Sequence, residues 1–293
     1  MHNLGLLFDV DGPLASPTTR TVAIERILTD LVALTGAGVP IAFITGRSDE
    51  FIRTRLVAPL MEVGLVDALA ADGARLFGVF EKGGSWAPIT THGMGDATVD
   101  RSVALPTKTV DAVRELVRRD FAGTMFFDET KKAMISVEQR TDVAHEVYLA
   151  AQTLFNDAAF ALLKSQGLGA RYGDEEAPDA SGQVPFRLDP TIISTDIESV
   201  KLDKDRGARR ALEYFASLGD LPRRWRSIGD SRSDYLMADY LHAQGFEVAH
   251  VDVRPSDGVL DRPYPVIVIE DAIHDDAGAE FLAHWMHELR LDV

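Results

Sequence analysis

Short apolar runs, each bounded by turn-forming residues, recur along this chain, and segments of helical period lie between several of them. The apolar runs cover residues 4–10, 40–45, 66–71, 225–229, 246–253 and 265–269. Apolar side chains repeat at helical spacing within residues 22–34, 208–215 and 236–241. Strands that alternate with helices in this way form a parallel sheet whose faces are covered by helices. The sequence therefore predicts an α/β fold.

The middle of the chain has a different pattern. Residues 83–100 are typical of a loop, 107–119 of a helix, 124–140 of a β-hairpin and 141–165 of a long helix. A stretch rich in Gly, Asp and Pro, 167–185, is expected to be a loop, and an extended run follows it. We therefore predict a discontinuous sheet domain, 1–82 and 195–293, interrupted by a smaller α+β domain, 83–194.

Composition excludes several classes of partner and site. The chain has 293 residues, of which 46% are hydrophobic, so about two folded domains are expected. A net charge of -16 opposes binding to nucleic acid or to an anionic membrane, although a small phosphorylated ligand can bind through a divalent cation. The absence of cysteine excludes thiol nucleophiles and disulfides. Residues 1–8 have no basic flank and no long apolar run, so we expect a cytoplasmic protein; its oligomeric state is left open.

Two carboxylates follow the first predicted strand. Asp9 and Asp11 lie two positions apart in the segment Asp-Val-Asp-Gly, and side chains at this spacing point the same way along an extended chain. Ligands of open parallel sheets bind at the carboxyl ends of the strands. Taken alone, the segment is equally typical of a turn or of a loop that binds a cation.

The second predicted strand ends in Thr45, Gly46 and Arg47, and Ser48 is a candidate N-cap for the helix that follows. A hydroxyl and free backbone amides at this point suit a phosphate group. The alternative is an ordinary strand-to-helix turn with a surface arginine.

A further acidic pair, Asp230 and Asp234, follows the strand predicted at 225–229. Carboxylates at a strand end can hold a hard cation, although these two could also be a helix cap and a first-turn residue. All three polar fragments fall at the carboxyl ends of strands predicted for one sheet. Independent turns would rarely coincide in this way.

This combination resembles the haloacid dehalogenase superfamily. The family's first motif is Asp-x-Asp-Gly, its second a Ser or Thr that ends a strand, and its last Gly-Asp-x-x-x-Asp. About thirty residues separate the first two motifs, and the insertion follows the second, which is similar to the type IIB cap of Cof-like phosphatases. Sugar-phosphate phosphatases and phosphomannomutases are similar in layout. The resemblance implies a Rossmann-like parallel-sheet core with an inserted α+β cap domain.

The family's third motif is a lysine that precedes the last motif. Lys204 opens a predicted helix for which Asp203 is a candidate cap, and Lys201 is a nearby alternative. We expect Lys204 to reach the phosphate, because Lys201 lies in an extended lead-in and most simply points to solvent. One departure from the Cof-like pattern is Ser233, where that pattern commonly has Asn.

The resemblance implies a phosphoric monoester hydrolase that acts on a small phosphorylated metabolite, with a sugar phosphate as the favoured substrate class. Asp9 would attack phosphorus to form an aspartyl phosphate. Asp11 would act as the general acid for the leaving alcohol and then as the base for water. Thr45, the amide of Gly46 and Lys204 would hold the transferring oxygens.

The implied cofactor is Mg²⁺, bound by Asp9, the backbone carbonyl of Asp11 and Asp230, with Asp234 helping directly or through water. Arg47 is a candidate for contacting the substrate. Two alternatives stay open. A phosphomutase would use the same aspartates and return the phosphoryl group to its substrate, and a non-catalytic phosphometabolite-binding protein could use the same fold.

Overall fold

The computed structural model describes residues 2–291, which divide into two compact units. One unit joins the segments up to Thr98 and from Asp203 onward, and the other spans Val99–Leu202. The sequence predicts these boundaries at 83 and 194, and two strands account for the difference. β4 (Ser85–Thr90) pairs with a strand of the first unit, and β12 (Ser194–Ser199) pairs with strands of the second.

The first unit is built on one large, mostly parallel sheet. The parallel strands are, in spatial order, β15 (Val266–Val268), β14 (Glu247–Asp252), β13 (Arg224–Gly229), β1 (Leu4–Phe8), β2 (Ile41–Ile44) and β3 (Leu76–Phe80). The antiparallel strands β4 and β5 (Gly93–Met94) continue the sheet beyond β3, and β6 (Thr98–Val99) pairs with β4. β1 and β2 are buried over their whole length, as strands covered on both faces must be. The predicted α/β fold is confirmed.

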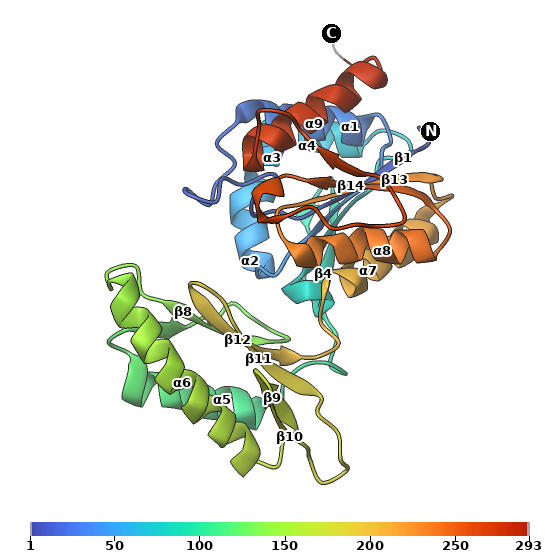
Figure 1. Ribbon diagram of the computed structural model, residues 1–293. Coiled ribbons are helices and arrows are strands. Elements are labelled where there is room, and N and C mark those ends of the chain that lie inside the picture. Colours follow the sequence, from blue (N-terminus) through green and yellow to red (C-terminus); the bar gives the residue numbers. More distant parts are fainter. Residues whose placement is uncertain (1, 292–293) are drawn as a thin grey trace. The chain divides into compact units, whose positions relative to one another are not determined.

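Helices cover both faces of this sheet (Figure 1). One face carries α1 (Glu25–Gly36), α3 (Ala58–Glu62), α4 (Leu65–Leu69) and α9 (His274–Glu288), and the other carries α7 (Lys204–Leu218) and α8 (Tyr235–Ala243). Alternate side chains of β1 enter the two cores: Phe8 packs on the side of Phe281, and Leu7 on the side of Phe215. Complete burial of a side chain of this size stabilises the fold by about 1.5–3 kcal/mol.

The helical periods predicted within 22–34, 208–215 and 236–241 are confirmed as α1, α7 and α8, whereas α9 was not anticipated. Within residues 2–291, no helix combines the length and the apolar character that crossing a bilayer requires.

The strand predicted at 66–71 is wrong. This run lies largely in α4, which starts after Gly64 in the left-handed conformation (φ 103°). It is rich in Ala and Leu, which favour helix, and Ala68 packs close to Gly36 at the end of α1. The third parallel strand is β3 instead. Gly78 weakened the strand pattern of this segment in the sequence. The structure requires glycine there, because a Cβ at position 78 would lie 2.5 Å from the ring of Phe80.

The second unit has its own sheet and core. Its strands are ordered β10 (Glu175–Ala177), β9 (Ala170–Tyr172), β11 (Phe186–Pro190), β12, β8 (Ile135–Gln139) and β7 (Met125–Phe127), with helices α5 (Thr107–Leu116) and α6 (His145–Ser165). The predicted hairpin and both predicted helices are confirmed. The loops predicted at 83–100 and 167–185 are wrong in part, because they contain β4–β6 and β9–β10. Most of these strands have only two or three residues, too few for an alternating pattern to show.

Candidate active site

Three strand ends meet at one edge of the sheet in the first unit. β1 lies between β13 and β2, so the residues that follow these strands, Asp9, Asp230 and Thr45, become neighbours. The amide of Asp9 donates a hydrogen bond of 2.8 Å to the carbonyl of Ile228, which extends the pairing one residue beyond β1. The sheet therefore brings together motifs that are far apart in the sequence.

The loop after β1 turns sharply around Gly12. The amide of Ala15 donates to the carbonyl of Val10 at 2.8 Å, and the amide of Gly12 donates to the carbonyl of Ala15 at 2.9 Å. Gly12 has a φ of 96°, and a Cβ there would lie 2.6 Å from Cγ of Asp230. Only glycine satisfies both conditions, so Gly12 allows the first and last motifs to touch.

Asp234 is held by the turn that follows β13. The amide and the hydroxyl of Ser231 donate to Oδ2 of Asp234 at 2.9 and 2.7 Å. Gly229 leaves room for this carboxylate, since a Cβ at that position would lie 2.2 Å from Cβ of Asp234. Because Ser231 is the cap of this turn, the alternative in which Asp230 serves only as a cap is wrong.

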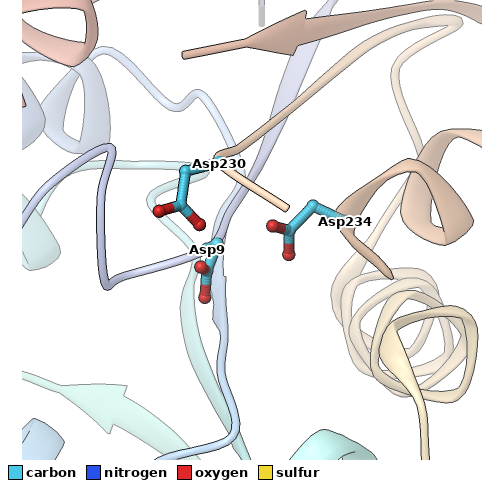
Figure 2. A group of neighbouring side chains, drawn as sticks. All are labelled: Asp9, Asp230 and Asp234. Carbon is cyan, nitrogen blue, oxygen red and sulfur yellow. The ribbon is translucent and has the colours of Figure 1, made fainter. Parts of the chain in front are cut away.

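Three carboxylates converge at this point. Asp9, Asp230 and Asp234 each offer one oxygen, and these oxygens all lie within 4.8 Å of one another (Figure 2). Asp9 and Asp234 are buried, and Asp230 is partly buried. For Asp11 the predicted ligand is the backbone carbonyl, and its side chain is paired with Arg47. Hard oxygen ligands grouped in this way suit Mg²⁺.

Lys204 lies against two of these carboxylates. Asp203 caps α7, as predicted, by accepting a hydrogen bond from the amide of Lys204 at 2.9 Å. The Lys204 ammonium is buried, lies 2.7 Å from Oδ1 of Asp9, contacts the carboxylate of Asp234 and donates to the carbonyl of Ile44 at 3.0 Å. Lys201, the alternative lysine, is exposed. Of the two, Lys204 is the one that the structure brings to the aspartates.

The charges of this cluster do not balance. Burial raises the pKa of Asp9 well above its usual value; Lys204 lowers it, and Asp234 and Asp11 raise it further. Burial and Asp234 raise the pKa of Asp230 to about 6. Burial alone would raise the pKa of Asp234 as well, but Lys204 and the hydrogen bonds from Ser231 lower it. Three carboxylates around one ammonium leave excess negative charge, which a divalent cation would offset.

Thr45 and Ser48 shape the second strand end. Thr45 is buried, and its hydroxyl accepts a hydrogen bond of 3.0 Å from the amide of Arg47. The hydroxyl of Ser48 accepts from the amide of Phe51 at 3.3 Å, so Ser48 caps α2 (Asp49–Ile52), as predicted. These two hydrogen bonds fix the backbone on either side of the Gly46–Arg47 segment.

Arg47 and Asp11 form a bidentate ion pair. Nε and Nη2 of Arg47 donate to the two carboxylate oxygens of Asp11 at 2.9 and 3.1 Å. The guanidinium also lies over the ring of Phe51, 4.8 Å from its centre. Both members of the pair are partly exposed. The predicted acid and the predicted substrate-contacting residue are therefore partners in this structure.

Sequence reasoning missed His274. The Nδ1 atom of His274 lies 3.7 Å from Oδ2 of Asp230, and His274 is the first residue of α9. In the same helix, Gly278 lies so close to the loop after β1 that a Cβ at this position would be 1.8 Å from the carbonyl oxygen of Pro13. The start of α9 therefore packs on the Asp11–Ala15 loop. A helical period within 274–288 was the signal that could have revealed it.

The chain has the fold of several solved phosphatases and hydrolases. It is 14% identical to trehalose-6-phosphate phosphatase of Aspergillus fumigatus over 97% of this chain and 93% of that chain, with a TM-score of 0.53. It is 12% identical to the C-terminal domain of C. albicans trehalose-6-phosphate phosphatase over 97% of this chain and 93% of that chain, with a TM-score of 0.59. A haloacid dehalogenase-like hydrolase of Bacteroides thetaiotaomicron is 13% identical, with 96% of this chain and 98% of that chain covered and a TM-score of 0.57.

No family model and no curated protein matches the sequence. The structural matches cover nearly the whole chain, including the inserted unit. The Rossmann-like haloacid dehalogenase fold with an inserted α+β domain, which the motifs predicted, is therefore confirmed. The low identities restrict this conclusion to the fold.

Proposed function

We propose that the protein is a Mg²⁺-dependent phosphatase that hydrolyses a small phosphorylated metabolite, with a sugar phosphate as the favoured class. The observation that carries this proposal is the grouping of Asp9, Asp230 and Asp234 around Lys204 at the strand ends. The names of the trehalose-6-phosphate phosphatases among the structural matches support the substrate class.

In this proposal Asp9 is the nucleophile. A carboxylate oxygen of Asp9 attacks phosphorus, the bond to the leaving oxygen breaks, and an aspartyl phosphate forms that water then hydrolyses. Lys204 supports the attack by stabilising the ionised form of Asp9, which burial disfavours. The position of Asp9 at the end of a rigid, buried strand keeps its carboxylate in place.

Asp9, Asp230 and Asp234 would hold Mg²⁺. When bound, the ion supplies positive charge that reduces the repulsion between a carboxylate nucleophile and a phosphate dianion. The residues fit this ion because they are oxygen ligands with excess negative charge, and because burial and the neighbouring Asp234, which raise the pKa of Asp230, disfavour a charge that a cation would stabilise.

The phosphoryl oxygens would be held by the loop after β2. The Thr45 hydroxyl and the Gly46 amide follow β2 at the strand end beside β1, and in this proposal they donate to the phosphoryl oxygens. Asp11 would protonate the leaving alcohol and then take a proton from the attacking water. The ion pair with Arg47 orients the carboxylate of Asp11, and in this proposal Arg47 leaves Asp11 to bind an oxygen of the substrate.

The experiment is phosphate release from 4-nitrophenyl phosphate, measured with Mg²⁺ and after removal of the ion by chelation, followed by a panel of sugar phosphates. We expect release that requires the ion and that Asp9→Asn abolishes. Release at the same rate without a divalent ion would contradict the metal dependence. Isomerised sugar phosphate in place of free phosphate would favour a phosphomutase, and no turnover of any ester would favour a binding protein.

A further inference from the structure

The first unit contains a cavity on the face of its sheet that α9 covers (Figure 1). It has a volume of about 690 Å³ and is lined by side chains from β13, β14, α9 and the segment at β15. Arg224 and Glu247, which line it, begin β13 and β14, whereas Asp9 and Asp230 follow the ends of parallel strands. The cavity therefore lies toward the opposite edge of the sheet from the proposed phosphatase site. Its volume is within the range of small-molecule sites.

Part of the lining is aromatic and aliphatic. Phe281 and Trp285 of α9 are both buried, and their rings meet edge to face with their centres 6.2 Å apart. Ile267 and Ile269, which lie in β15 and just after it, add partly buried aliphatic side chains. An apolar lining of this kind suits the body of an organic molecule and not a hydrated inorganic ion.

Two guanidinium groups lie beside the indole ring of Trp285. The Cζ atoms of Arg226 and Arg224 are 5.7 and 5.9 Å from the centre of this ring. The indole nitrogen is itself buried and has no hydrogen-bond partner within residues 2–291, which is uncommon for a donor in a native protein. Guanidinium groups stack on flat rings and bind carboxylate or sulfonate oxygens through two N–H groups.

The two guanidinium groups share one carboxylate. Among residues 2–291, Arg224 and Arg226 form ion pairs with Glu247 alone, at 3.3 and 3.8 Å, and this carboxylate is 63% exposed. Burial lowers the pKa of Arg226 and Arg224 lowers it further, whereas Glu247 raises it. Glu280 and Glu288 also line the cavity, but both are exposed on α9. The side chain of Arg226 is only 14% exposed, so its charge is poorly compensated, which favours an anionic ligand group.

We propose that this cavity binds a small organic anion with a flat apolar body, such as an aromatic carboxylate. The apolar body packs on Phe281 and Trp285, and the anionic group binds Arg226 and Arg224 in place of Glu247. This site is separate from the grouped aspartates, so the inference goes beyond the proposed function and does not depend on it.

The test is fluorescence titration with two probes of the same ring system. One is 8-anilinonaphthalene-1-sulfonate, an aromatic anion, and the other is N-phenyl-1-naphthylamine, which lacks the sulfonate and is uncharged. The parent protein is compared with Arg226→Gln and with Arg223→Gln. Arg223 is exposed, precedes β13 next to Arg224 and does not line the cavity, so it serves as the matched control.

The parent should bind one sulfonate probe per chain. Arg226→Gln should weaken binding of this probe about tenfold or more, as expected for loss of a charge-assisted hydrogen bond, and should leave binding of the uncharged probe unchanged. Arg223→Gln should change neither affinity. Thermal unfolding checks that each variant folds. If Arg226→Gln does not fold, Arg224→Gln takes its place, because the Arg224 side chain is 40% exposed and tolerates replacement better.

Unchanged affinity of the folded variant for the sulfonate probe would overturn the inference, as would a parent that does not bind this probe. An equal loss for both probes would also overturn it, because the arginine would then act on the apolar lining and not on the anion. Displacement of the sulfonate probe by inorganic phosphate with Mg²⁺ would place it at the grouped aspartates instead. A parent dimer that Arg226→Gln dissociates, measured by sedimentation, would assign the cavity to a second copy of this chain and contradict the proposal.

Discussion

The inner cluster of the site (Asp9, Asp234 and Lys204) and its outer pair (Asp11 and Arg47) carry the same kinds of charge in different surroundings. In the inner cluster no side chain is more than 10% exposed, whereas Arg47 and Asp11 are 21% and 33% exposed. Charges interact more strongly where water is excluded, and a buried charge without a partner is costly. The inner cluster therefore fixes the charge balance of the site, and the outer pair is placed to exchange partners and protons.

The largest effect is expected in the inner cluster, for Asp9→Asn. The amide keeps the shape of the side chain but cannot act as the nucleophile, so turnover of 4-nitrophenyl phosphate should fall by more than about 1,000-fold. Thermal unfolding and phosphate binding serve as controls and should stay near those of the parent. Activity within tenfold of the parent would refute the covalent role of Asp9.

Lys204→Ala tests the charge balance of the same cluster. It leaves Asp9 and Asp234 without their shared cation, so we expect turnover to fall about 30- to 1,000-fold and the metal-free protein to lose about 3–5 kcal/mol of unfolding free energy. Lys201→Ala removes an exposed charge and should leave both quantities unchanged. The opposite pattern in kinetics and urea unfolding would assign the role to Lys201.

Asp11→Asn tests whether the outer pair transfers protons. Turnover of a sugar phosphate, whose leaving alcohol needs a proton, should fall about 100-fold, whereas hydrolysis of 4-nitrophenyl phosphate should fall less than about tenfold. The same preparation is assayed on both substrates, so a folding defect would lower both rates together. Equal losses would show that Asp11 is not the acid.

The smallest effect concerns Asp230, at the edge of the inner cluster. Its pKa rises from 3.8 to about 6 in the folded, metal-free protein, so between these values the folded state holds a proton that the unfolded chain has lost. The contribution of Asp230 to the free energy of unfolding is fully present below pH 3.8 and is lost as the pH rises through about 6. The loss should amount to about 2 kcal/mol after allowance for partial exposure.

Urea unfolding of the metal-free protein across this pH range checks the prediction. Asp230→Asn should remove that part of the pH dependence, and it should also reduce the stabilisation that Mg²⁺ gives at neutral pH. Parallel stability curves for the parent and the variant would contradict the assignment.

The residues at the strand ends were more predictable from the sequence than the outer pair. Asp9, Thr45 and Asp230 each follow an apolar run, and strand ends of a parallel sheet converge, so the pattern alone placed them together. The pairing of Arg47 with Asp11 depends on the direction of two long or flexible side chains, which no spacing specifies. The expectation that Arg47 contacts substrate remains a proposal for that reason.

The remaining differences arise where tertiary contacts override a local pattern. The apolar run at 66–71 forms a helix because it packs on α1, and β4 joins the first unit because it pairs with β3.

The most direct measurement is acid quenching of a single turnover with excess enzyme, followed by mass spectrometry of the peptide that contains Asp9. We predict that Asp9 carries one phosphoryl group at early times and loses it as phosphate appears, and that Asp11→Asn prolongs its lifetime because water then lacks its base. Release of the alcohol and phosphate with no phosphoryl group on Asp9 at any quench time would contradict Asp9 as the covalent nucleophile.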